Sequence, residues 1–405
     1  MRILLVEPDY YTRYPPLGLL KLASFHRTYG DKIQYVRGNV DSLETPDSIE
    51  VTSLFTYSWK PVHEAVEFYH ANFPEARITV GGIYATLMPD HIQETFPFVK
   101  VHQGLHLKAE NLLPSYDLLQ SVDKWKDWKK SIVFTTRGCI RKCPFCVVPK
   151  IEGGLKESKF SVLPLIHPNH KEVVMWDNDF LASPYAKDIL IELRDGGYRA
   201  DFNQGLDARL MTEEFAGLLA DIKSNTIHMA YDWPWEGPYI DKAIDLLDKA
   251  GYRKKNLIFY VLHNFYDEQH KRGDTPEDLL HRLQDLMEWG ASAYPMRYIP
   301  LDSLTRSGYV SPLWTREQLE MVADARRVLG YAGTFVNYRA LVAKFTEARS
   351  FEEALELHPV TGKTHTRQHL EIEESHAFSP IMQSRTRPSF QAPQSSAEKD
   401  SFSFE

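Results

Sequence analysis

Two series of alternating strand and helix patterns run along the chain. In the first, over residues 1–105, the short apolar stretches MRILLVEP, KIQYVRGN, EVTSLFTYS and RITVGGIYA alternate with segments, 16–29 and 61–72, whose apolar residues recur every three or four positions. Stretches of the first kind predict strands, and segments of the second kind predict amphipathic helices. Because strands separated by helices usually pair in parallel, this series predicts a small parallel sheet flanked by helices.

The second series is longer and more regular. Six strand patterns follow one another: SIVFTTRG, EVVMWDNDF, RADFNQGLD, TIHMAYD, NLIFYVLHN and AYPMRYIPL. The last five are each followed by a helical pattern, over 184–195, 212–222, 239–250, 276–289 and 316–329. Right-handed crossovers curl such a sheet, so the pattern predicts a full or partial (β/α)6 barrel of the TIM type over 131–335. Functional side chains are then expected at the carboxyl ends of the strands.

The remaining segments are weakly periodic. Residues 106–130 are polar and contain tryptophan, which predicts a linker or a bridging helix. A helical extension is predicted over 336–376. The tail, 377–405, is rich in Ser, Pro and Gln and is predicted to be disordered. The fold class is therefore α/β, with a small parallel sheet, a partial barrel, a helical C-terminal region and a tail.

Composition limits where the chain works. With 405 residues and 43% hydrophobic content it can bury two or three domain cores. Its longest apolar runs, such as NLIFYVL, are too short to cross a bilayer, and the start MRILLVEPDYY lacks the basic start region and the small-residue cleavage site of a signal peptide. We therefore expect a cytoplasmic protein that contacts no membrane. The net charge of −8 provides no general attraction to nucleic acid.

All three cysteines of the chain fall in one stretch, TTRGCIRKCPFCVV, directly after the first strand of the second series. An odd number of thiols in a reducing compartment argues against disulfides and for metal binding or catalysis. A structural zinc would need a fourth ligand such as His102 or His167. A catalytic thiol with a histidine base would use only one cysteine. Three thiolates could instead bind three irons of a 4Fe-4S cluster and leave the fourth iron open.

The spacing of these cysteines is that of a known family. The pattern CIRKCPFC, Cys-x3-Cys-x2-Cys with Phe145 directly before the last cysteine, resembles the signature of the radical S-adenosylmethionine (SAM) superfamily. The resemblance implies that Cys139, Cys143 and Cys146 bind one 4Fe-4S cluster, whose open iron chelates SAM. It implies that one-electron reduction then cleaves SAM to a 5′-deoxyadenosyl radical, which abstracts hydrogen from a substrate. It also places Phe145 near the adenine.

The resemblance assigns further positions near SAM. In WDNDF, Asp177, Asn178 and Asp179 stand where the family receives the ammonium group of SAM, although they could equally cap the following helix. Asp232 ends the fourth strand, where many relatives carry a Glu-Ser pair, and would meet the ribose hydroxyls. Arg297, on the sixth strand, would contact adenine or substrate, or pair with a nearby acid.

Two strand ends bear on the substrate. The third strand ends in the polar segment NQGLDARL, where Arg209 could clamp a carboxylate or phosphate of the substrate, or form a salt bridge with Asp207. We therefore name Arg209 and Asp232 as candidate catalytic residues. The fifth strand ends in VLHNFYDE, with His263 and Asn264, where relatives often have a glycine-rich loop. This departure leaves the substrate class and the reaction outcome open.

The first hundred residues carry a second resemblance. PPLGLLKLASFHR and RITVGGIYATLMPDHI resemble the Rossmann-like N-terminal domain of the cobalamin-binding branch of the superfamily, although the domain is short and lacks an Asp-x-His-x-x-Gly stretch. The Gly81-Gly82 turn leaves two possibilities open. The domain binds cobalamin there, or it keeps the fold without binding cobalamin. The alternatives are thus a cobalamin-dependent radical SAM methyltransferase and a non-catalytic zinc-binding interaction protein. No spare cysteine exists for the auxiliary clusters of methylthiotransferases or for a methyl-cysteine mechanism.

The family also implies a partner, a low-potential electron donor of the flavodoxin or ferredoxin type. A basic run near the cysteines would dock such an acidic protein, or would be an ordinary solvated face: Lys124, Lys126, Lys129, Lys130, Arg137, Arg141, Lys142 and Lys150. Together with Trp59, Trp125 and Trp128, this run admits a nucleotide as well as another small molecule as substrate.

Overall fold

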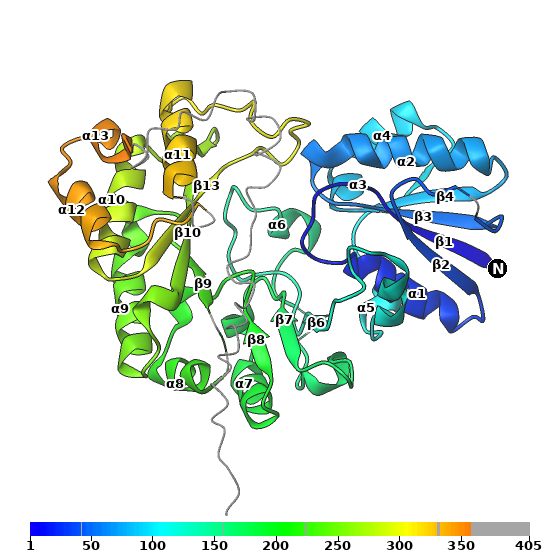
Figure 1. The fold of residues 1–405 in the computed structure, drawn as a ribbon, viewed down its shortest axis with the longest axis horizontal. Helices are drawn as coiled ribbons and strands as arrows, with labels where there is room; N and C mark the ends of the chain where they lie inside the picture. The colour runs from blue at the N-terminus through cyan, green and yellow to red at the C-terminus, as the bar shows by residue number, and fades with distance from the viewer. Residues whose placement is uncertain (42, 157, 223, 225, 330–332, 358–405) are drawn as a thin grey trace, which may run out of the picture.

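The computed structural model describes residues 1–357 apart from 42, 157, 223, 225 and 330–332. The predicted tail, 377–405, lies outside the described residues, as does the end of the predicted helical extension. The described chain is a mixed α/β protein with two parts that stand side by side in Figure 1. Among these residues, no helix has both the length and the apolar character needed to cross a bilayer.

The N-terminal part is built on a five-stranded sheet in which every neighbouring pair is parallel. Its strands are β1 (Arg2–Glu7), β2 (Lys32–Arg37), β3 (Ser48–Ser53), β4 (Arg77–Gly82) and β5 (Lys100–Val101), in the order β2-β1-β3-β4-β5. Helix α1 (Leu17–Arg27) covers one face, and α2 (Trp59–Asn72), α3 (Ile83–Leu87) and α4 (Pro89–Thr95) cover the other (Figure 1). The order reverses between β1 and β3, and such a reversal opens a crevice at the carboxyl edge of a sheet.

The Gly81-Gly82 turn at that edge gives a first prediction. Gly82 has φ of +103°, and a Cβ added there would overlap the carbonyl oxygen of Ser53 on the neighbouring strand. A Cβ on Gly81 would meet only ordinary contacts, the nearest at 3.7 Å from His102. We expect Gly82→Ala to destabilise the N-terminal part by about 3 kcal/mol or more, and the control Gly81→Ala by less than about 1 kcal/mol. Urea unfolding followed by circular dichroism compares the two variants. Equal unfolding midpoints would contradict the close approach of Gly82 to Ser53.

The second part contains the six predicted strands in chain order. They are β6 (Lys130–Val133), β7 (Glu172–Met175), β8 (Arg199–Asp201), β9 (Ile227–Ala230), β10 (Leu257–His263) and β13 (Ser292–Arg297). They form two parallel three-stranded sheets, β6-β7-β8 and β9-β10-β13, which one parallel bridge joins, from Leu206 to Met229. Each of the last five strands leads into a helix: α7 (Ala186–Asp195), α8 (Glu213–Asp221), α9 (Gly237–Lys249), α10 (Pro276–Glu288) and α11 (Arg316–Leu329).

Shorter elements complete the described chain. A small helix α6 (Val148–Ile151) follows the cysteines, and a hairpin of β11 (Tyr266–Asp267) and β12 (Arg272–Gly273) follows β10. Helices α12 (Arg339–Glu347) and α13 (Phe351–Leu355) pack beside α10 and belong to the predicted helical extension. The hairpin was not predicted from the sequence, since its strands are only two residues long.

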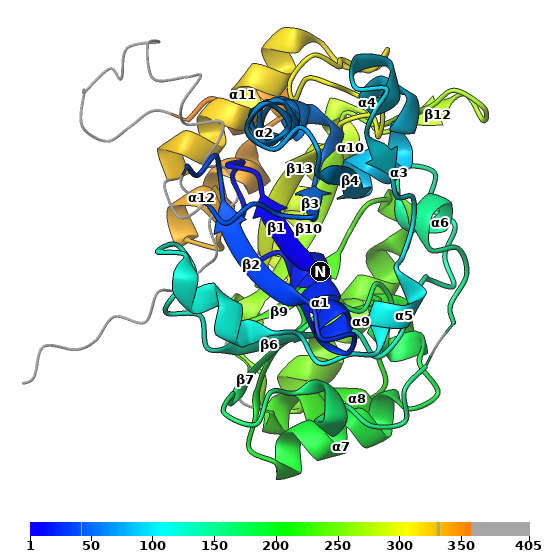
Figure 2. The same ribbon diagram turned by 90° about the vertical axis from the view of Figure 1, so that its right-hand side faces the viewer.

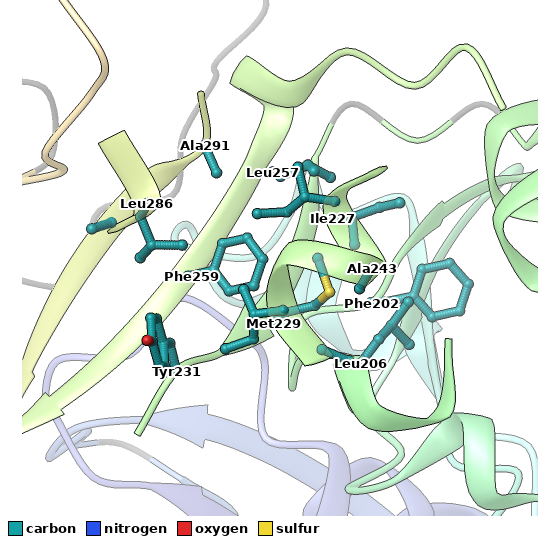
Figure 3. Packing of buried hydrophobic residues seen from close by; sticks show 14 of the residues in the cluster. Phe202, Leu206, Ile227, Met229, Tyr231, Ala243, Leu257, Phe259, Leu286 and Ala291 are labelled. Carbon is teal, nitrogen blue, oxygen red and sulfur yellow. The ribbon is translucent and has the colours of Figure 1, made fainter. Parts of the chain in front are cut away.

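The helices pack on the outer face of these strands. Figure 3 shows Met229 and Phe259, from β9 and β10, among the buried residues that include Ala243 of α9 and Leu286 of α10. Side chains alternate between the faces of a strand. Because Ile227 and Met229 lie in this outer core, His228 and Ala230 point to the inner face.

The inner face is partly covered by the N-terminal part (Figure 2). Leu17, at the start of α1, forms a buried cluster with Ile132 of β6 and Val174 of β7. Ahead of it, the ring of Tyr14 lies 5.1 Å from that of Trp176. The loop between β1 and α1 therefore reaches from the crevice of the N-terminal sheet onto the inner face of the second part.

Residues 106–130 are neither an exposed linker nor one long bridging helix. They hold the short helix α5 (Leu107–Glu110) and a 3₁₀ turn, and Tyr116, Leu119 and Trp125 are buried against β1 and α1. The indole N–H of Trp125 donates to the buried carboxylate of Glu7 at 2.7 Å. The segment is a packed part of the N-terminal body.

Candidate functional site

The three cysteines lie on one loop between the carboxyl end of β6 and α6. All are half-buried, and no disulfide joins them. The peptide N–H of Arg141 donates to Cys139 Sγ at 3.2 Å, and that of Val148 donates to Cys146 Sγ at 3.5 Å. The N–H of Cys146 donates to the carbonyl of Cys143 at 3.0 Å, so the last two cysteines share a tight turn. Peptide N–H groups directed at sulfur favour the thiolate, which is the form that binds metal.

The thiols are poorly ionised without a cation. Burial raises the pKa of Cys139 to about 12 and that of Cys143 to about 11. A bound metal ion compensates the charge and deprotonates a coordinating thiol outright. This donor set fits a cationic metal centre better than a free nucleophile.

Asp177, which follows β7, fixes the start of the cysteine loop. Its buried Oδ1 accepts four hydrogen bonds of 2.6 to 2.9 Å, from the peptide N–H and the hydroxyl of both Thr135 and Thr136. Burial raises the pKa of this carboxyl. The described residues offer no hydrogen-bond partner to its other oxygen, Oδ2. The contacts therefore give Asp177 a role in holding the loop rather than in capping the next helix.

A second carboxylate, Glu152, fixes the part of the loop directly before the first cysteine. It accepts from the peptide N–H of Gly138 at 2.7 Å, from Arg137 at 3.1 Å and from the side-chain amide of Asn178 at 2.9 Å. Gly138 has φ of +75°, and a Cβ there would overlap the carbonyl of Gly154. Asn178 thus also serves the loop, which is held from both sides before the first cysteine.

Asp177 gives a prediction that separates its two assigned roles. An asparagine keeps the Oδ1 acceptor, whereas Asp177→Ala leaves four buried donors unpaired and is expected to cost about 3 kcal/mol. We expect Asp177→Ala to lose amide protection over 134–138 in hydrogen exchange, and Asp177→Asn to retain it. Should Asp177→Asn keep this protection but lose SAM binding, the carboxylate would be a SAM ligand through Oδ2 instead.

Asp179 is the predicted ammonium acceptor that lies closest to a cysteine. Its Oδ2 is 3.3 Å from Cys139 Sγ, and its Oδ1 is buried with no hydrogen-bond partner in the described chain. Burial raises the pKa of this carboxyl. A cationic group bound beside Cys139 would donate a hydrogen bond to this unpaired oxygen.

Arg209 forms the salt bridge that was the alternative to substrate binding. Its Nε donates to Asp207 at 2.6 Å, and its Nη1 donates to Glu236 at 3.2 Å. Asp207 also accepts from Arg141 of the cysteine loop, at 2.8 Å. Arg209 is therefore fixed by two carboxylates, and this network ties the loop to the end of β8.

Asp232 stands at the end of β9, as predicted, and faces the same space. A cavity open to solvent is lined by Cys143, Leu206, Asp207, Ala208, Arg209, Ala230, Asp232, Glu236 and Ile240. Burial and the charge of Glu236 raise the pKa of Asp232 to about 7. Its carboxylate accepts from the peptide N–H of Leu262 at 3.2 Å. Cys143, Arg209 and Asp232 are thus brought together, as their places at strand ends predicted.

Phe145 and Arg297 lie apart from this cavity's lining. The ring of Phe145 packs against Phe265, at 5.4 Å, and against Trp233, at 6.4 Å. Arg297 donates to the backbone carbonyls of Ser307 and Tyr309, at 3.1 and 2.8 Å. Phe145 therefore forms an aromatic wall, and these two hydrogen bonds of Arg297 hold a loop.

His263 and Asn264 serve the same loop. Asn264 has φ of +66°, and its side chain accepts from the N–H of Ser311 at 2.8 Å and donates to the carbonyl of Tyr309 at 3.2 Å. His263 is buried with its ring 5.5 Å from that of Trp314. The polar pair thus supplies structure at the end of β10.

Three residues of the site were missed from the sequence. Glu152 holds the cysteine loop, and Glu236 holds Asp232. Arg282 of α10 is fully buried under the ends of β9 and β10. The burial of Arg282 could have been predicted from the sequence, because it lies three residues after Leu279 on the apolar stripe of an amphipathic helix. The contacts of Glu152 span distances in sequence that no local pattern reveals.

The suggested zinc ligands lie elsewhere. The ring of His102 lies beside that of His106, and His167 packs against Tyr116 and His170. In the described part of the chain, no three His, Cys, Asp or Glu side chains are grouped as ligands of a single metal ion.

The basic run is not one exposed face. Arg137 is buried and bonded to Glu110 and Glu152, and Arg141 turns inward to Asp207. Trp125 and Trp128 use their indole N–H groups within the fold, and Trp59 packs on His63 and His91. These tryptophans pack in the fold, so they give no support to base stacking by a nucleotide substrate.

Comparison with known proteins identifies the fold. No protein-family model and no curated protein matches the sequence. Two solved structures are similar, each at 14% identity: the radical SAM methyltransferase TsrM from Kitasatospora setae, with tryptophan and a SAM analogue bound, and the cobalamin-dependent SAM radical enzyme OxsB, with aqua-cobalamin bound. The TM-scores are 0.55 and 0.51. The matches cover 80% and 71% of this chain, 76% of TsrM and 52% of OxsB. The chain therefore has the fold of these radical SAM enzymes, and its match spans about half of OxsB.

Proposed function

We propose that this protein is a radical SAM enzyme that binds one 4Fe-4S cluster and cleaves SAM reductively to modify a small substrate. The observation that carries the proposal is the cysteine loop itself. Three half-buried thiols with the family's spacing share one braced loop at the carboxyl end of the first of six parallel strands. The arrangement supports a cluster with three protein ligands at Cys139, Cys143 and Cys146.

The six strands are proposed to act as one partial (β/α)6 barrel. Their order in space follows their order in sequence, and the bridge from Leu206 to Met229 continues the pairing from one three-stranded sheet to the next. In such a barrel the carboxyl ends of all six strands face the same mouth. This accounts for the approach of Cys143, Arg209 and Asp232 to one cavity.

The chain's own residues would bind and orient SAM. When bound and reduced, the cluster supplies the electron that splits the sulfonium of SAM into methionine and a 5′-deoxyadenosyl radical. Asp179 offers an open carboxylate oxygen beside Cys139 for the amino group of SAM, and Asp232 offers an acceptor for its ribose hydroxyls. Phe145, with Phe265, supplies an apolar wall for the adenine. Arg209 is assigned a positioning role, through Asp207 and Glu236, rather than a direct one.

The test is anaerobic purification and reconstitution of the full chain. We expect about four iron and four sulfide per chain. Addition of dithionite and SAM should then release 5′-deoxyadenosine even without a substrate. A protein that is reconstituted with iron and sulfide but leaves SAM intact would refute the proposal, as would a protein that purifies with stoichiometric zinc. The proposed physiological reductant is a flavodoxin or a ferredoxin.

A cobalamin-dependent radical SAM methyltransferase is the second candidate, and the similarity to the fold of OxsB favours it. The residues present do not fit a corrin where the two parts touch, because direct contacts join them there. Tyr14 packs on Trp176, and the hydroxyl of Thr56 donates to the carbonyl of Ser303 at 2.7 Å. No step is therefore assigned to cobalamin. Corrin absorbance in the purified protein would reverse this choice.

A further inference from the structure

A cluster of polar side chains on the inner face is only partly hydrogen-bonded. Four segments each place one buried polar atom there without a hydrogen bond in the described chain: Arg13 Nη2, Trp176 Nε1, Asp201 Oδ1 and His228 Nδ1. A buried polar group left unpaired costs about 1–3 kcal/mol. Four such groups in one place indicate that they are completed by something other than the protein.

Two tyrosines join these four side chains into one cluster, the Arg13 cluster. The ring of Tyr14 lies 5.1 Å from that of Trp176, and the ring of Tyr260 stacks on His228 at 5.4 Å. Asp201 Oδ1 is 3.9 Å from His228 Nδ1. Burial raises the pKa of Tyr260, the charge of Asp201 adds to this rise and the charge of Arg13 opposes it, so both charged side chains lie near this ring. The Arg13 cluster thus combines one cation, one anion and flat aromatic surfaces.

The Arg13 cluster is open and lies next to the proposed SAM site. The side chain of Asp201 is 40% exposed, although one of its oxygens is covered. Ala230 is exposed although it lies on β9, and it shares the inner face with His228 two residues away. Ala230 also lines the cavity that contains Cys143 and Asp232. One face of β9 therefore runs from the Arg13 cluster to the cysteine loop without a large side chain between them.

We propose that the Arg13 cluster binds the substrate, and that this substrate is an aromatic α-amino acid. The Arg13 guanidinium would pair with the carboxylate, Asp201 would accept from the ammonium, and the rings of Tyr14, Tyr260 and Trp176 would enclose the side chain. The amino acid satisfies both charges at once, whereas a simple anion or cation satisfies one. Its role as substrate rests on the proposed function, but its binding does not, because no residue of the Arg13 cluster belongs to the cysteine loop.

Calorimetry on the full chain tests this with three probes: L-phenylalanine, 3-phenylpropionate, which lacks the ammonium, and 2-phenylethylamine, which lacks the carboxylate. A hydrogen bond to a charged group is worth about 1.5–3 kcal/mol, so L-phenylalanine should bind at least about 10-fold more tightly than either analogue. Arg13→Gln should weaken the binding of L-phenylalanine by about 10-fold or more and leave the affinity for 2-phenylethylamine unchanged. Asp201→Asn should weaken the binding of L-phenylalanine to a similar extent and leave the affinity for 3-phenylpropionate unchanged.

The surface variant Arg27→Gln, at an exposed ion pair with Asp117, is the matched control and should bind all three probes like the wild type. Absence of L-phenylalanine binding up to millimolar concentration would overturn the inference and assign the four atoms to water. Equal weakening of all three probes by Arg13→Gln would overturn it as well. Binding with the expected pattern but no 5′-deoxyadenosine release would refute the proposed function and leave this site standing.

Discussion

Each of the single substitutions Cys139→Ala, Cys143→Ala and Cys146→Ala is expected to remove the bound iron and to lower 5′-deoxyadenosine formation by more than about 100-fold. Loss of an outer partner of a metal site already costs about 10–100-fold, and these are the proposed ligands themselves. The sequence holds no other cysteine that could replace a lost ligand. Iron analysis and chromatography of the reaction products measure both effects on protein reconstituted in parallel with the wild type.

The three substitutions also separate the interpretations that the sequence left open. A cluster requires all three thiols, so the three variants should fail alike. If only one of them lost activity, that cysteine would be a nucleophile instead. Ile140→Ala is the matched control, because this side chain is 46% exposed on the same loop and carries no metal donor. It should retain iron and activity, which shows that disturbing the loop surface alone is harmless.

The elements of the fold were predictable where one face of a segment is buried. Helix α8 was expected over 212–222 and spans Glu213–Asp221, and α11 was expected and observed over the same residues, 316–329. Burial of one stripe imposes the 3.6-residue period that reveals such helices. Residues 106–130 lacked this period because they fold as short turns that pack through isolated side chains, Trp125 among them. Their apolar contacts follow the surface of β1 and α1 and not a helical repeat.

The site was predictable in position but not in its internal contacts. The places of Cys143 and Asp232 at strand ends follow from topology, because parallel strands bring their carboxyl ends to one edge. That Asp177 would bond Thr135 and Thr136 could not be foreseen, because the contact joins residues 41 and 42 positions apart. The predicted pairing of Arg209 with Asp207 was local in sequence, and it is present.

Arg282→Met is expected to be the most destabilising single change in the second part of the chain. Arg282 is fully buried, and its Nη1 lies within 3.0 Å of the carbonyl oxygens of Tyr231, Asp232 and Leu262, at the ends of β9 and β10. Its Nη2 lies 3.5 Å from Asp274. Removing one partner of a buried ion pair costs about 3–5 kcal/mol, because the other charge is left uncompensated.

The effect should extend to activity through Asp232. The carbonyl of Asp232 is one of the three that Arg282 holds, and the Asp232 side chain faces the cavity beside Cys143. We expect Arg282→Met to lower the urea midpoint and, in the fraction that folds, to weaken SAM binding. Arg282→Lys should be intermediate, because an ammonium keeps the charge but lacks the planar set of donors. His281→Leu, on the exposed side of α10, should behave like the wild type.

A second substitution distinguishes lost charge compensation from lost packing. Burial raises the pKa of Asp274 to about 6, and the charge of Arg282 opposes this shift. Without Arg282 the carboxylate is buried beside no cation, so Asp274→Asn in the Arg282→Met background should recover about 1–3 kcal/mol of stability at pH 7. In the wild type, Asp274→Asn should destabilise instead, since it removes the partner of a buried guanidinium. If the double variant were less stable than Arg282→Met alone, the loss would come from packing and strand-end hydrogen bonds, and the ion pair would not be its cause.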